Sequence, residues 1–149
     1  PIVFSVVVDE LISAISGGNN ATILTRALTA TGSPLFSRRS DRQAFPGEEL
    51  VIIPAPFFAH ALAQNYSSPA LKVVKSINGI PVKNLLHLVK IMRDAKDEFI
   101  VIDFAGYAGE ALVFKRQELI ASTEEILNDS GIRAQGSPDM LAVWSEKPR

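Results

Sequence analysis

The segment 71–103 constrains the fold of this chain more than any other part of its sequence, because its pattern changes repeatedly over a short distance. A stretch rich in Val and Ile, 72–77, has the composition of a pleated strand. Asn78-Gly79 follows at once, and both residues tolerate the positive φ angles of a type I′ hairpin turn. Pro81 has no N–H to donate to a sheet, so the return strand at 80–82 is expected to be short or at an edge.

A helix and another strand are expected directly after this hairpin. Asn84 is a suitable N-cap, because its side-chain oxygen can accept a backbone N–H of the first helical turn. The apolar residues that recur at helical spacing and would face a core are Leu85, Leu88, Val89 and Met92. Phe99 to Phe104 is apolar at nearly every position, which favours a strand that is covered on both faces.

The rest of the chain is expected to form shorter elements separated by glycine and proline. Strands are expected at 2–8, 50–53 and 110–114, and helices at 9–17, 22–28, 57–64 and 116–128. Asp9 is the expected cap of the first helix, and Gly131 is expected to end the last one. Residues 30–47 lack a clear period and are expected to form a long surface loop, and residues 136–149 an irregular tail.

Composition indicates a single globular domain spanning residues 1–149. Hydrophobic residues make up 47% of the chain, and the net charge of −1 provides no field that would attract nucleic acid or an anionic membrane. There is no cysteine, which excludes disulfides and thiolate metal sites, and no apolar run reaches the roughly 18 residues that span a bilayer. The chain begins with a strand-like segment and without an initiator Met, so we expect it to be a fragment of a larger protein.

The sequence contains no convincing catalytic or metal-binding constellation. A Ser-His-Asp triad needs a histidine base, and only His60 and His87 are present, without a G-x-S-x-G motif. His60 lies among apolar residues and is expected to be structural, whereas His87 is expected on a helix, either at the surface or at the rim of a groove. Two distant histidines without clustered carboxylates make a weak metal site, so neither a metal nor another cofactor is expected. A small hydrolase that uses His60 is the least favoured reading.

Short motifs extend along most of the chain. INGIPVKNLLHLV at 77–89 leads into DEFIVIDF at 97–104. The other motifs are IVFS with a following LI (2–5 and 11–12), ELVII (49–53), AST with IL (121–123 and 126–127), and GI with SPDM (131–132 and 137–140). In this order they resemble the C-terminal PDZ domain of the Do-like (Deg/HtrA) serine proteases, specifically the plant Deg type.

The resemblance implies an α+β fold of PDZ type, with a strongly bent antiparallel sheet, a partly open barrel, two main helices and an extra C-terminal helix. A PDZ fold binds an extended peptide as an added strand, in a groove between one strand and one helix. The resemblance places that strand at 4–8, that helix at 84–94 and a carboxylate-binding loop at 1–4. The expected peptide-binding residues are Ile2, Val3, Phe4, Ser5, Val6, Leu86, Val89 and Lys90. The equally weighted alternative is that the apolar members of this set are core residues.

The sequence departs from the family pattern at the expected carboxylate loop. Pro1 has no amide N–H within a chain, and the glycines typical of this loop are missing from 1–4. A groove occupied by an internal segment or by a neighbouring subunit is therefore favoured over binding of a terminal carboxylate.

The resemblance implies a non-catalytic module that binds peptide or protein segments, or docks subunits in a homo-oligomer, and so regulates a protease domain in its parent chain. The alternative is a freestanding interaction or scaffold module with no protease domain.

Overall fold

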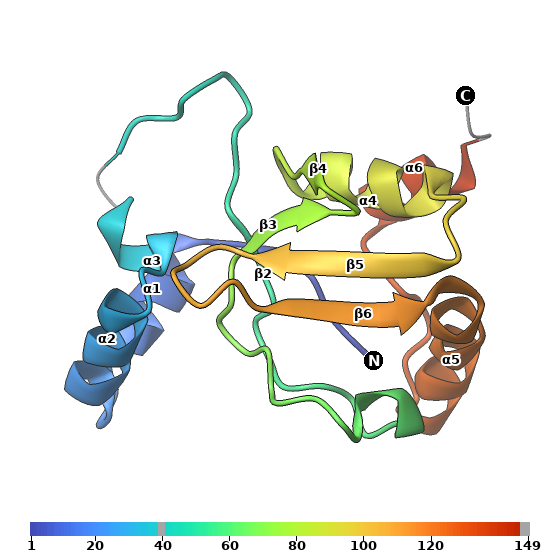
Figure 1. The fold of residues 1–149 in the computed structure, drawn as a ribbon, viewed down its shortest axis with the longest axis horizontal. Coiled ribbons are helices and arrows are strands. Elements are labelled where there is room, and N and C mark those ends of the chain that lie inside the picture. Colours follow the sequence, from blue (N-terminus) through green and yellow to red (C-terminus); the bar gives the residue numbers. More distant parts are fainter. Residues whose placement is uncertain (39–40, 147–149) are drawn as a thin grey trace.

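A computed structural model describes residues 1–38 and 41–146 of this chain (Figure 1). Its strands are β1 (Ser5–Val6), β2 (Val51–Ile52), β3 (Val74–Ile77), β4 (Ile80–Pro81), β5 (Phe99–Phe104) and β6 (Ala111–Lys115). Its helices are α1 (Asp9–Gly17), α2 (Ala21–Ala30), α3 (Pro34–Ser37), the 3-10 helix η1 (Ala61–Ala63), α4 (Leu85–Asp94), α5 (Arg116–Asp129) and α6 (Pro138–Ser145). The expected mixed α+β class is confirmed. Within the described residues, no helix has both the length and the apolar character needed to cross a membrane.

The strands form two antiparallel sheets that do not close into a barrel. Four strands pair in the order β4-β3-β5-β6, and β1 pairs with β2 in a separate sheet of two strands. An isolated antiparallel bridge between Ile52 and Val73 joins the two sheets. The described strands therefore show the expected antiparallel pairing without the barrel-like closure that the sequence led us to expect.

The β3–β4 hairpin forms at the residues that the sequence indicated. Asn78 and Gly79 have φ angles of 48° and 76°, as the expected type I′ turn requires. The Asn78 side chain also extends the sheet, because its Oδ1 accepts the Val101 N–H (2.7 Å) and its Nδ2 donates to the Phe99 carbonyl (3.1 Å). One residue thus closes the turn and joins it to β5.

The main core lies between the four-stranded sheet and α4. It includes Ile77, Leu88 and Ile102, each at most 2% exposed, and residues of β2 and β6 complete it. The expectation that β5 is covered on both faces is wrong, because buried and more exposed residues alternate along it. Phe99 on the outer face is 41% exposed.

Helices α1, α2 and α3 form a separate lobe beside the sheet (Figure 1). A second cluster of buried residues anchors this lobe: Ile12, Leu35, Ile52 and Val73. Asp9 is not the N-cap of α1, because Val8 occupies that position and Asp9 lies in the first helical turn. Its carboxylate is nevertheless placed where the helix dipole favours negative charge.

Other expected boundaries need correction. The strand expected at 2–8 is reduced to Ser5–Val6, and the helix expected at 57–64 is reduced to the 3-10 turn η1. The expected loop at 30–47 contains α3, whose Leu35 is 1% exposed, and the expected tail contains α6. Residues 39–40 and 147–149 of those two expected segments lie outside the described residues.

Candidate functional site

The N-terminal segment is held in the structure by its backbone and by two apolar side chains. Ile2 and Phe4 pack against the main core, whereas Val3 is 41% exposed. Ser5 pairs with Ile52, and the Phe58 N–H donates to the Pro1 carbonyl (2.9 Å). Among the described strands β1 pairs only with β2, so its other edge has no partner strand.

Helix α4 begins with the predicted cap. The Asn84 Oδ1 accepts the His87 N–H (2.8 Å), and the Asn84 Nδ2 donates to the Gly47 carbonyl (2.9 Å). The His87 Nδ1 in turn accepts the Lys83 N–H at 3.3 Å, so the side chain at the third helical position bonds back to the residue before the N-cap, whereas a capping box bonds back to the N-cap N–H itself. This exchange fixes the first turn of α4 and connects it to the loop before β2.

The electrostatics at this end of α4 favour a neutral histidine. Burial lowers the pKa of His87, and the positive charges of Lys83 and Lys90 lower it further. The neutral ring is also the form that can accept a hydrogen bond at Nδ1. Geometry and charge therefore agree that the capping contact belongs to the neutral imidazole.

The candidate peptide-binding residues of α4 lie on its more exposed faces. Leu88 is buried, and Leu85 and Met92 pack against the same core as Ile2 and Phe4, so the predicted inward direction of these three α4 residues is confirmed. Leu86 is 38% exposed, and Val89 and Lys90 are half-buried. The N-terminal segment and α4 thus share one core cluster. Two open depressions on the described part of the chain, one at the β3–β4 turn and one at 57–64, are not lined by residues of β1 or α4.

Helix α6 packs against α4, a contact that the sequence did not predict. The Arg93 guanidinium is at its centre: it donates to the Val143 carbonyl (2.8 Å) and lies 3.2 Å from the Glu146 Oε2. Two hydrogen bonds to Asp94, at 2.6 and 2.9 Å, hold the guanidinium in place. The Arg93 side chain is only 8% exposed, so α6 covers the part of α4 that presents it. The adjacent Ser137 and Pro138 are the overlooked sequence signal for a helix start.

His60 connects η1 to α5. Its Nδ1 accepts the Leu62 N–H (3.2 Å), so the neutral ring carries its proton on Nε2, which lies 3.2 Å from the Glu125 Oε2. The ring thereby caps η1 and links two elements that are distant in sequence. No cluster of three or more His, Cys, Asp or Glu side chains suited to a metal ion occurs in the part of the chain that the structure describes.

Comparison with known proteins decides the family. The model of the PDZ domain family matches residues 2–139 of this chain. The chain belongs to the PDZ domain family. A similar relative is Protease Do-like 2 from the chloroplast of Arabidopsis thaliana, which is 30% identical over 100 residues. That alignment covers 67% of this chain but only 16% of the relative, and no protease domain is found in these 149 residues.

The family match confirms the resemblance seen in the sequence and implies that this PDZ domain binds a peptide or protein. Which residues form the binding surface stays a prediction. Its candidates are the residues expected from the sequence: Ile2, Val3, Phe4, Ser5, Val6, Leu86, Val89 and Lys90.

Proposed function

We propose that this PDZ domain is a non-catalytic module of a Do-like serine protease. It binds extended peptide segments or docks protease subunits, and so regulates a protease domain in its parent chain. The observation that carries the proposal is the PDZ match over residues 2–139 together with the similarity to a plant Do-like protease. The protease activity itself is that of the relative, of which this chain spans about a sixth.

The unpaired edge of β1 supports the mechanism of binding. An extended segment can add to a free strand edge through main-chain hydrogen bonds, while neighbouring side chains select among sequences. Ser5 and Val6 would provide that edge, with Ile2, Val3 and Phe4 leading into it. Leu86, Val89 and Lys90 of α4 would line the opposite wall.

Docking of a subunit is the second form of the same proposal. Proline has no amide N–H to donate to a carboxylate within a chain, and the segment 1–4 contains none of the glycines typical of a carboxylate-binding loop. The segment 1–4 is therefore poorly suited to hold a free carboxylate. An internal segment of a partner subunit, which has no terminal carboxylate, fits this surface better.

A peptide-library pull-down tests the proposal. Each sequence is presented with a free C-terminus and with a C-terminal amide, and binding that does not distinguish the two is expected. Leu86→Asp places a charge on the proposed wall and is expected to reduce binding at least tenfold. Ile120→Asp is the matched control, because Ile120 is 48% exposed on α5, outside the proposed surface.

Two outcomes would contradict the groove. One is full binding by L86D, and the other is an equal loss in L86D and I120D. If no peptide binds, sedimentation measures whether the domain associates with itself in a Leu86-dependent way. The absence of both peptide binding and self-association would contradict the proposal.

A further inference from the structure

The β3–β4 turn contains the single Asn-Gly pair of the sequence, Asn78-Gly79. In such a pair the backbone nitrogen of the glycine can attack the side-chain Cγ of the asparagine, because glycine has no Cβ to hinder the approach. Ammonia leaves, a five-membered succinimide ring forms, and water opens that ring to aspartate or isoaspartate. The net reaction consumes one water and releases one ammonia. Deamidation of Asn78 therefore needs no enzyme and no cofactor.

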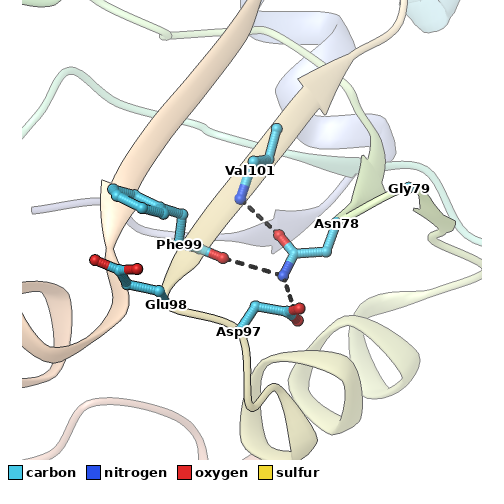
Figure 2. A pocket seen from close by; sticks show the side chains of 6 residues that line it. All are labelled: Asn78, Gly79, Asp97, Glu98, Phe99 and Val101. Atoms are coloured by element: carbon cyan, nitrogen blue, oxygen red, sulfur yellow. Dashed lines mark hydrogen bonds between the residues drawn. The ribbon is translucent and has the colours of Figure 1, made fainter.

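Water reaches this turn. Gly79 is exposed, and apart from its chain neighbours no heavy atom lies within 4 Å of the position that a Cβ would take there. Asn78 and Gly79 also line a shallow, open depression of about 500 Å³ together with the start of β5 (Figure 2). Solvent access does not limit the reaction, so its rate depends on whether the Asn78 Cγ can approach the Gly79 nitrogen.

Three hydrogen bonds hold the Asn78 carboxamide. Its Oδ1 accepts the Val101 N–H (2.7 Å), and its Nδ2 donates to the Phe99 carbonyl (3.1 Å) and to the Asp97 Oδ2 (2.9 Å). The three partners lie on β5 or just before it, and Figure 2 shows the carboxamide directed towards them and away from Gly79. Because attack on Cγ requires the side chain to rotate towards the glycine nitrogen, these bonds must break first.

We propose that Asn78-Gly79 is a latent deamidation site, which β5 protects in the folded domain and which opening of the hairpin exposes. The product cannot restore the protected arrangement, because a carboxylate only accepts hydrogen bonds whereas the Asn78 Nδ2 donates to Phe99 and Asp97. The new negative charge would also repel the Asp97 carboxylate. A brief opening of the hairpin that leads into α4 is thereby converted into a permanent change.

Peptide mapping by mass spectrometry, after incubation at mildly alkaline pH, measures aspartate and isoaspartate at position 78. The folded domain is expected to deamidate about a hundredfold more slowly than the urea-unfolded chain, because three hydrogen bonds must break together. The free peptide of residues 72–84 has no β5 and should react as fast as the unfolded chain; measuring it with and without urea corrects for the denaturant. Equal rates in the folded domain and in the free peptide would overturn the proposal.

Variants of Asp97 separate this specific protection from the general rigidity of a folded chain. Asp97→Ala removes one of the three bonds at an exposed position and should accelerate deamidation of the folded domain about fivefold. Asp97→Asn keeps an acceptor for the Asn78 Nδ2 and should restore most of the protection. Glu98→Ala is the matched control, because it removes the adjacent exposed carboxylate and none of the three bonds.

The rate in E98A should equal that of the unchanged domain. Protection by β5 is overturned if D97A reacts as slowly as E98A, or if D97A and D97N are accelerated equally. A slower reaction in D97A than in the unchanged domain would also overturn it, since the Asp97 carboxylate would then promote the attack on Asn78 rather than prevent it.

Discussion

Replacing Asn78 by glycine or alanine separates the two contributions of this residue to the hairpin. Asn78→Gly keeps the freedom to adopt a φ of 48° but loses the side-chain bond to the half-buried Val101 N–H. An unpaired backbone group at such a position costs about 1.5 kcal/mol. Asn78→Ala loses the same bond and also places a β-carbon in the left-handed region, which costs about 1 kcal/mol more.

We therefore expect the free energy of unfolding to fall by about 1.5 kcal/mol in N78G and by about 2.5 kcal/mol in N78A. Urea denaturation measures both values, and thermal midpoints should fall by about 3 °C for each kcal/mol. Asn128→Ala, at an exposed position of α5, is the control and should change stability by less than about 0.5 kcal/mol. The reasoning is refuted if N78G and N78A are equally stable, or if neither differs from the unchanged domain.

Three further perturbations follow from the structure. Burial and nearby lysines lower the pKa of His87 in the folded protein. The contribution of the neutral ring to stability is therefore complete above the ordinary histidine pKa of about 6.5 and is lost as the pH falls through the lower folded pKa. In His87→Gln, urea denaturation between pH 7 and pH 5 should no longer show this loss of stability. Ile102→Ala should lower the free energy of unfolding by about 3 kcal/mol, since Ile102 is fully buried, and an unchanged denaturation midpoint would contradict the described core. Arg93→Ala removes the hydrogen bond between α4 and the Val143 carbonyl of α6. Because α6 would then pack less closely, the fluorescence of Trp144, the single tryptophan, should shift to longer wavelength. An unchanged spectrum would show that Arg93 does not hold α6 in place.

Local signals in the sequence predicted the hairpin and the start of α4. Asn78-Gly79 and Asn84 act through contacts with residues close in the sequence or with an adjacent strand, and such contacts leave a readable pattern. The Phe57–Gln64 segment was misjudged, because its apolar residues pack as an irregular segment in which His60 caps only one 3-10 turn. Tertiary packing overrode local propensity there.

The two helices that we failed to predict begin in the same way. Ser33 precedes Pro34 at the start of α3, and Ser137 precedes Pro138 at the start of α6. Serine at the N-cap followed by proline is a recognised start signal, although in short segments with glycine nearby it is easily taken for a turn. The contact of Arg93 with α6 could not be predicted without that helix.

The candidate groove depends on the packing of two elements that are distant in the sequence, and no local sequence pattern encodes that packing. The family resemblance indicated which strand and helix would face each other, and the structure places Phe4 and Met92 against one core cluster. Whether a ligand adds to the free edge of β1 depends on contacts with a second molecule.

Amide hydrogen exchange in the presence of a selected peptide tests the central proposal most directly. At saturation, the amides of Phe4 and Val6, which point away from β2, should exchange at least tenfold more slowly, because an added strand protects the free edge of β1. The amides of β6 should be unaffected. Protection that appears elsewhere and leaves residues 2–6 unchanged, although the peptide is bound, would contradict strand addition at β1.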